Sequence, residues 1–245
     1  MKKVTSIFAA LMLLMTSAYA IDEAGLTATL NGPERADVDK GRDASRQPAQ
    51  VLSFLGLEEG MTALDIMASG GWYTEVLSHA VGPEGTVLMQ NSPRSLGMRD
   101  TEAAVQARVA DNRLPNVQRV NRDMGDLGIE SASVDFALTA LNFHDLYNTD
   151  PAAAQAMLLA VKDTLKPGGI IGIIDHRGNP GADNASLHRI TQESIEQALF
   201  DAGFESVASS DVLHAADDPR TSGPFDPGLG RNTDRIVLRA YKPGM

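Results

Sequence analysis

The sequence contains no cysteine, which excludes disulfides, thiolate metal sites, a cysteine nucleophile and a lipid-modified cysteine anchor. Basic residues are also scarce: 21 Lys and Arg stand against 32 Asp and Glu, which gives a formal net charge of −11 and a pI near 4.8. A surface that binds nucleic acid needs a basic face, so this balance argues against nucleic acid as a partner. No apolar run reaches the roughly 20 residues that a membrane-spanning helix needs.

The first 20 residues have the features of a secretory signal peptide. Lys2 and Lys3 give a positive start, Ile7–Met15 is a short apolar run, and Ala18-Tyr19-Ala20 is a small-x-small cleavage pattern. We expect cleavage after Ala20 and a periplasmic or secreted protein with no stable membrane anchor after cleavage; an uncleaved anchor is the alternative. Cleavage removes two lysines and no acid, which takes the formal net charge from −11 to −13.

The rest of the chain divides into a polar N-terminal arm and one α/β domain. Residues 21–47 are rich in Asp, Arg and Gly and predict an irregular arm, whereas residues 48–245 alternate apolar runs with helical spacing. This alternation predicts a doubly wound, Rossmann-like and mostly parallel sheet of about seven strands. The stretch 211–234 is either a lid or a tolerated surface excursion. The predicted strands are 62–66, 86–90, 116–121, 133–141, 170–174, 204–209 and 235–240.

A strand, a small-residue turn and the start of a helix follow one another between Leu64 and Ser78. Gly70 and Gly71 let the backbone of the turn approach a ligand and adopt positive φ, and the free N–H groups of the next helix would face that ligand. In a doubly wound sheet the ligand lies beyond the carboxyl ends of the strands. Polar residues that follow other strands therefore share this edge: Asn91, Asp123 with Met124, Asn142 to Asp145, and Asp175 to Arg177.

This order of motifs resembles the class I S-adenosylmethionine-dependent methyltransferases over about residues 49–242. The run from Asp65 to Gly71 stands where that family has its glycine-rich first motif, and Leu165-Lys166-Pro167-Gly168-Gly169 is similar to its late motif. The stretches 70–75, 175–177, 187–189 and 233–235 resemble a branch of exported bacterial proteins described as predicted methyltransferases. Two positions depart from the family pattern: Met67 replaces a glycine, and Asn91 replaces an acid that grips the ribose hydroxyls.

The resemblance implies S-adenosyl-L-methionine as the cofactor and also implies the residues that bind it. Asp65 would lie under the methionine and ribose part of the ligand, and Asp123 with Met124 would contact the adenine. The implied cofactor-binding residues are Asp65, Met67, Ala68, Ser69, Gly70, Gly71, Tyr73, Thr74, Asn91, Asp123 and Met124.

Histidines at the ends of strands are the candidates for a catalytic base. His144 and His176 follow the fourth and fifth predicted strands, each beside an aspartate, Asp145 or Asp175. An imidazole with a pKa of about 6.5 can accept a proton at neutral pH. We therefore take His144, Asp145 and His176 as candidate catalytic residues, with a structural role for the histidines as the alternative. We expect no metal, although the same four side chains also suit a divalent ion.

The sequence thus predicts an exported S-adenosylmethionine-dependent methyltransferase that acts on a small molecule. Arg177, His188 and Arg189, which follow the fifth strand, are candidate substrate-binding residues. His188 and Arg189 could contact an anionic substrate, or could equally be solvated. Two alternatives stay open: a non-catalytic ligand-binding protein on the same scaffold, and a metal-assisted hydrolase or lyase that uses the histidine and aspartate edge. A nicotinamide-dependent oxidoreductase fits less well, because the first motif lacks the G-x-G-x-x-G spacing.

Overall fold

The computed structural model of this protein describes residues 21–244, so the signal peptide predicted over residues 1–20 lies outside the described residues. The strands are β1 (Thr62–Ile66), β2 (Thr86–Gln90), β3 (Val117–Val120), β4 (Val134–Ala140), β5 (Leu165–His176), β6 (Glu205–Ser210) and β7 (Arg235–Tyr241). The helices are α1 (Glu23–Leu30), α2 (Asp37–Lys40), α3 (Asp43–Arg46), α4 (Pro48–Leu55), α5 (Trp72–Val81), α6 (Pro93–Leu96), α7 (Thr101–Val109), α8 (Phe143–Thr149), α9 (Pro151–Thr164) and α10 (Gln192–Asp201), with 3-10 turns η1 (Ala110–Asn112) and η2 (Pro227–Leu229). Between residues 21 and 244, no helix combines the length and the hydropathy needed to cross a membrane.

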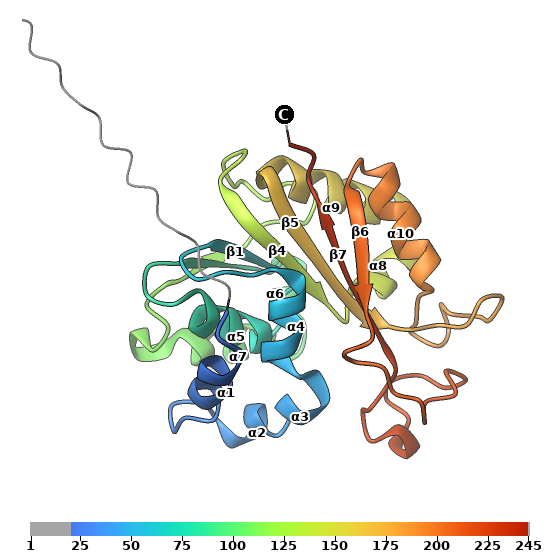
Figure 1. Ribbon diagram of the computed structural model, residues 1–245, viewed down its shortest axis with the longest axis horizontal. Coiled ribbons are helices and arrows are strands. Elements are labelled where there is room, and N and C mark those ends of the chain that lie inside the picture. The colour runs from blue at the N-terminus through green and yellow to red at the C-terminus, as the bar shows by residue number, and fades with distance from the viewer. Residues whose placement is uncertain (1–20, 245) are drawn as a thin grey trace, which may run out of the picture.

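The strands form one seven-stranded sheet in the order β3-β2-β1-β4-β5-β7-β6 (Figure 1). Strands β1 to β5 are parallel, and β7 runs antiparallel to both β5 and β6. The predicted doubly wound, mostly parallel α/β fold is therefore confirmed. The strand order reverses between β1 and β4, and in such sheets the crevice at this reversal is where ligands bind.

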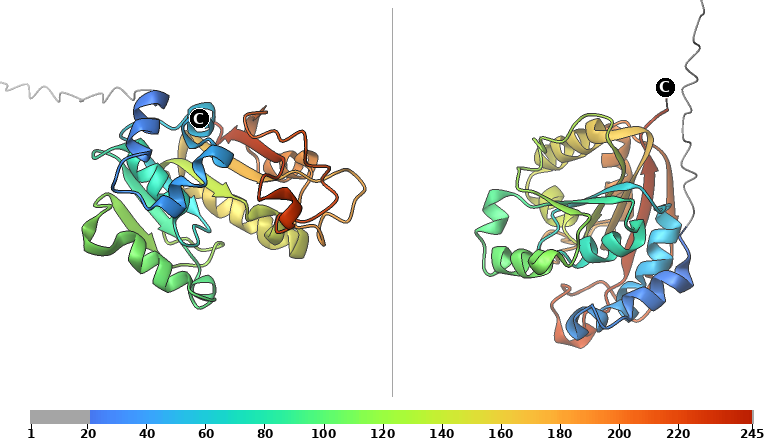
Figure 2. Two further views of the ribbon diagram at one scale, coloured as in Figure 1. Left: turned by 90° about the horizontal axis from the view of Figure 1, so that it is seen from below. Right: turned by 90° about the vertical axis from the view of Figure 1, so that its left-hand side faces the viewer.

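Helices cover both faces of the sheet, and each strand divides its side chains between them (Figure 2). In β1, Ala63 packs in the cluster that contains α1, α4 and α5, whereas Leu64 and Ile66 pack in the cluster that contains α9 and α10. Successive side chains of a strand point to opposite faces, so a strand covered on both faces is a continuous apolar run. This explains why β1 and β4 show no alternation in the sequence.

Strand β5 is longer than the five residues that its apolar run predicts. It begins at Leu165 rather than at Ile170, because Leu165 pairs with Val134 and the backbone of Gly168 and Gly169 exchanges hydrogen bonds with Lys242. Contacts with two segments distant in sequence therefore hold these residues in the sheet, although Gly168 has a φ of 76° and the register shifts between Leu165 and Ile170. The late glycine-rich motif forms the first part of the strand instead of a separate turn.

The N-terminal arm, which the sequence predicts to be irregular, contains the short helices α1, α2 and α3. Glycine and threonines give α1 little intrinsic helical preference, but Leu26 and Leu30 are buried in the core, so tertiary packing stabilises it. Arg35 is 2% exposed and donates to both carboxylate oxygens of Asp43 at 2.7 and 3.1 Å. The arm is thus an ordered part of the domain.

The long segment between β6 and β7 lies beside the arm at one end of the molecule (Figure 2, right). The Gln47 side chain donates to the carbonyl of Val212 at 2.9 Å, and Arg235 donates to the carbonyl of Ser45 at 2.6 Å. Asp218 and Asp234 anchor the interior of the segment, because both side chains are buried. The arm and this segment together cover the carboxyl edge of the sheet.

Candidate active site

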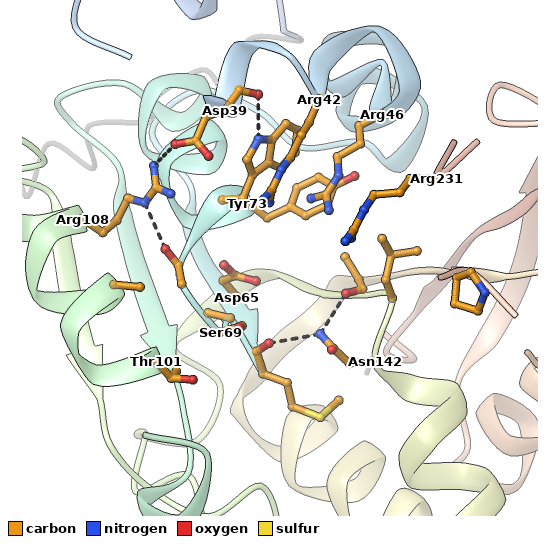
Figure 3. A pocket seen from close by; sticks show the side chains of 18 of the residues that line it. Asp39, Arg42, Arg46, Asp65, Ser69, Tyr73, Thr101, Arg108, Asn142 and Arg231 are labelled. Atoms are coloured by element: carbon orange, nitrogen blue, oxygen red, sulfur yellow. Dashed lines mark hydrogen bonds and ion pairs between the residues drawn. The ribbon is translucent and has the colours of Figure 1, made fainter. Parts of the chain in front are cut away.

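A cavity of about 680 Å³ opens at the carboxyl ends of β1, β4 and β5 (Figure 3). Its floor is the turn after β1, and its walls come from the end of β4, His176 at the end of β5 and the start of α7. The arm contributes Arg42 and Arg46, and the segment before β7 contributes Phe225 and Arg231. The volume lies in the range of about 300–1,000 Å³ that is typical of small-molecule sites.

Asp65 places a buried carboxylate at the floor of this cavity. The side chain is 2% exposed, and Thr74 Oγ1 donates to Asp65 Oδ2 at 2.6 Å. Burial raises the pKa of Asp65 to about 7, although the bond from Thr74 lowers it. Thr74 is itself fully buried, so it holds Asp65 in place. A cationic group in the cavity would favour the charged carboxylate.

The turn after β1 is held in a tight conformation by its neighbours. Met67, Ser69 and Gly71 have φ values of 53°, 51° and 76°, which lie in the left-handed region. A Cβ on Gly71 would lie 2.6 Å from the terminal methyl group of Met89, so a side chain there would displace Met89 and would also be strained at this positive φ. Arg108 Nε donates to the carbonyl of Gly70 at 3.0 Å. The backbone of the turn is therefore fixed in place beneath the cavity, with Met67, Ala68, Ser69 and Gly70 in its lining.

Asn91 binds this turn through both ends of its amide. Its Oδ1 accepts from the Ser69 N–H at 2.9 Å, and its Nδ2 donates to the Ser69 carbonyl at 3.1 Å. A carboxylate could accept the first bond but could not donate the second, which explains why an amide occupies this position. Asn91 is 1% exposed and does not line the cavity. Asn91 therefore has a structural role in holding the turn, and its role as a ribose contact stays a prediction.

The predicted adenine contacts also lie outside the cavity. Asp123 is exposed and Met124 packs partly against the core, and neither lines the cavity. The cavity instead extends along the start of α7, where Asp100 and Thr101 offer polar groups. The periodicity of the sequence does not predict that the cavity extends along α7, because periodicity does not determine which loops fold over the sheet edge.

Two aromatic rings and an arginine form the wall on the arm side. Trp72 and Tyr73 meet edge to face with ring centroids 4.7 Å apart. The guanidinium of Arg46 lies 4.4 Å from the Trp72 centroid and 5.6 Å from that of Tyr73. The Trp72 indole donates to the carbonyl of Asp39 at 3.1 Å, so this ring joins the arm to α5. Stacking on the rings directs Arg46 toward the cavity (Figure 3).

Among the described residues, five arginines that line the cavity have no carboxylate partner, and Arg99, just before α7, is one of them. Among the residues that the structure describes, Arg42, Arg46 and Arg231 form no ion pair, and the Arg235 guanidinium donates only to two carbonyls and the Thr233 hydroxyl. In a protein with a formal net charge of −11 this is a local excess of positive charge. The sequence pattern does not indicate that these residues form a group, although Arg42 and Arg46 stand four apart.

Arg177 and Arg189, two of the candidate substrate-binding residues, are held by internal partners. Arg189 is fully buried and pairs with Asp218 at 2.9 Å. Arg177 pairs with Asp234 at 3.2 Å, and its other nitrogen donates to Gln192 at 2.8 Å. Their charges are therefore compensated within the protein. These arginines fasten the loop after β5 to the segment before β7.

The predicted catalytic histidines lie close together but in different environments. His176 lines the cavity and its Nδ1 bonds with Thr233 Oγ1 at 2.7 Å. Burial, together with the positive charges of His144 and nearby arginines, lowers the pKa of His176 to about 2, so it is neutral and a weak base. His144 does not line the cavity. Its burial would lower its pKa, but hydrogen bonds to Asp145 and Asp175 raise the pKa to about 9. Neither is thus poised as a proton acceptor at neutral pH.

Comparison with known proteins identifies the fold. No protein-family model and no curated protein sequence matches this chain. A SAM-dependent methyltransferase from Aquifex aeolicus shares the architecture at 22% identity with a TM-score of 0.61, and the match covers 90% of this chain and 98% of that one. The [4+2]-cyclase SpnF matches at 17% identity and a TM-score of 0.57, over 82% of each chain.

A protein from Bordetella parapertussis described as a possible exported protein matches at 15% identity with a TM-score of 0.55, over 83% of this chain and 68% of that one. At these identities the likeness establishes the fold. The protein thus has the Rossmann-like fold of the class I S-adenosylmethionine-dependent methyltransferases.

Proposed function

We propose that this protein is an exported S-adenosylmethionine-dependent methyltransferase that acts on a small anionic molecule. The observation that carries the proposal is the opposition of Asp65 and Arg46 across the cavity (Figure 3). The methionine part of the cofactor ends in an ammonium and a carboxylate. Among the described residues neither Asp65 nor Arg46 forms an ion pair, so the buried carboxylate of Asp65 suits the ammonium and the guanidinium of Arg46 suits the carboxylate.

The remaining residues of the cavity support the same assignment. The side-chain nitrogen of Asn142 donates to the carbonyls of Met67 and Ala140 at 3.1 and 2.8 Å, which directs its oxygen as an acceptor for a ligand. When bound, S-adenosylmethionine supplies an electrophilic methyl group. The chain's own residues hold donor and acceptor at reacting distance, which contributes about 7–11 kcal/mol in well-oriented cases. Asp100 and Thr101 would lie along the nucleotide end.

The acceptor would lie under the roof formed by the arm and the segment before β7. Arg42, Arg231 and Arg235 surround this side of the cavity without carboxylate partners, so a carboxylate or phosphate group on the acceptor suits it. Phe225 lines the same region and would exclude water from a bound acceptor. His176, being neutral, would position the acceptor by a hydrogen bond rather than remove its proton.

Calorimetry on the chain 21–245 tests the donor site. We expect S-adenosylmethionine and its demethylated product to bind, and Arg46→Gln to weaken binding about 10- to 100-fold, because a hydrogen bond to a charged group contributes about 1.5–3 kcal/mol. Arg94→Gln, at an exposed arginine outside the cavity, serves as the matched control. The proposal is refuted if neither S-adenosylmethionine nor its demethylated product binds at about 1 mM.

A second measurement tests the acceptor class. Transfer of a labelled methyl group is compared between carboxylate-bearing and neutral small molecules, with wild type and Arg231→Gln. We expect Arg231→Gln to raise the KM for the anionic acceptor and to leave donor affinity unchanged. A preference for neutral acceptors would refute the anionic class alone. Export is tested separately by cell fractionation and by sequencing the N-terminus, which should begin at Ile21.

A further inference from the structure

Three side chains beside the cavity form a compact group of metal-ligand type. Among residues 21–244, His144, Asp145 and His188 are a set whose candidate ligand atoms all lie within 4.8 Å of one another. Asp145 Oδ1 is 3.2 Å from His144 Nε2 and 2.7 Å from His188 Nδ1. Two ligands at about 2.0 Å from a tetrahedral zinc ion lie about 3.3 Å apart. One pair is close to this spacing, the second is shorter, and all three atoms lie within 4.8 Å, so side-chain adjustment would bring the group to the spacing that an ion needs.

Asp175 orients His144, one of the three candidate metal ligands, through two hydrogen bonds. It is fully buried, and its two oxygens accept from His144 Nδ1 at 2.6 Å and from the His144 backbone N–H at 2.8 Å. Because Nδ1 carries the proton in this bond, the lone pair of the neutral ring is at Nε2, the atom that faces Asp145. Metal-binding histidines typically donate their other ring N–H to a carboxylate in this manner.

The site is accessible from solvent and lies next to the cavity. The side chains of His188 and Asp145 are 49% and 58% exposed. The ring centroids of His144 and His176 lie 5.6 Å apart, and those of His188 and Phe225 lie 6.2 Å apart, and both His176 and Phe225 line the cavity. Three protein ligands leave a coordination position open, as in catalytic zinc sites.

We propose that His144, Asp145 and His188 bind one divalent transition-metal ion, and that Zn²⁺ is the ion best suited to two imidazoles and one carboxylate. The ion takes the place of the protons that the three side chains share in their hydrogen bonds. Asp175 is a positioning residue, and His176 stays outside the site because its Nδ1 bonds with Thr233. The metal site does not depend on the proposed methyl transfer.

Zinc titration of the chelator-treated chain 21–245, followed by calorimetry and elemental analysis, tests the site. We expect one ion per chain with a Kd of about 1 μM or lower. Asp145→Asn and His188→Ala, at half-exposed positions, should each weaken binding more than about 100-fold, and Asp175→Asn about 10- to 100-fold. His214→Ala is the matched control, because His214 is another half-exposed histidine paired with an aspartate, Asp234 at 3.0 Å.

Cobalt spectroscopy supplies a second readout, since Co²⁺ bound to imidazole nitrogen in a tetrahedral site absorbs visible light. The site is supported if wild type and His214→Ala show this absorption and stoichiometric zinc, and His188→Ala shows neither while keeping its circular dichroism spectrum. The proposal is overturned if wild type binds no zinc at the stated affinity. It is equally overturned if His188→Ala and Asp145→Asn bind zinc as wild type does.

Discussion

Replacing Asp65 with asparagine should make the protein more stable in alkaline solution while weakening its donor site. Asp65 is nearly inaccessible, and its carboxylate accepts a hydrogen bond from Thr74 at 2.6 Å. Asparagine has almost the same shape and can keep this bond, but it does not ionise. The substitution therefore isolates the free energy of a buried charge.

The sign follows from the pKa of Asp65 in the two states. Burial raises the pKa to about 7 in the folded protein, from 3.8 in the unfolded chain. The stability contributed by the neutral carboxyl is fully present below pH 3.8 and is lost as the pH rises through about 7. Roughly three pKa units at about 1.36 kcal/mol each correspond to on the order of 4 kcal/mol lost by pH 8.

Urea unfolding of wild type and Asp65→Asn at pH 5 and pH 8 measures this loss. The stability advantage of the variant should grow by roughly 2–3 kcal/mol between the two pH values, because about a third of the loss has already occurred at pH 5. Taking the difference between pH values cancels any fixed effect of the substitution. Asp211→Asn, at an exposed position, should show no such growth. An advantage of Asp65→Asn that is constant with pH would refute the reasoning.

Asp65→Asn should also weaken ligand binding, although it should raise stability in alkaline solution. A cationic ligand would stabilise the ionised carboxylate, so binding near pH 7 should release protons from wild type. Calorimetry of S-adenosylmethionine in two buffers with different ionisation enthalpies counts these protons. Asp65→Asn should bind more weakly and release fewer. Equal proton release by both proteins would show that Asp65 does not face the ligand.

Three further substitutions test individual contacts. Arg189→Met should lower the free energy of unfolding by about 3–5 kcal/mol, because Asp218 would stay buried without its partner; a loss below about 1 kcal/mol in urea unfolding would contradict the buried pair. Asn91→Asp should cost about 1–3 kcal/mol, because it cannot donate to the Ser69 carbonyl; an unchanged thermal midpoint argues against this role. Gly71→Ala combines a φ of 76° with a steric clash, so it should lower the thermal midpoint and donor affinity together; unaltered binding in calorimetry would exclude tight backbone approach.

The sequence by itself determined the layers of the fold. Strand β1 spans Thr62–Ile66 as its apolar run predicts, and helix α5 begins at Trp72 directly after the glycines of the turn. These features depend on neighbouring residues: a buried strand needs a short apolar run, and a tight turn needs small residues that accept positive φ. Chain order then fixed a parallel sheet with its ligand edge at the carboxyl ends.

Only the tertiary structure decided which polar residues face the cavity. Arg46 reaches it because the arm folds over Trp72, whereas Arg189 does not, because Asp218 lies beside it in the core. His188 meets Asp145 across 43 positions of chain. Local sequence patterns specify whether a side chain lies at the carboxyl edge of the sheet. Its partner depends on segments distant in the chain, whose contacts neither composition nor periodicity encodes.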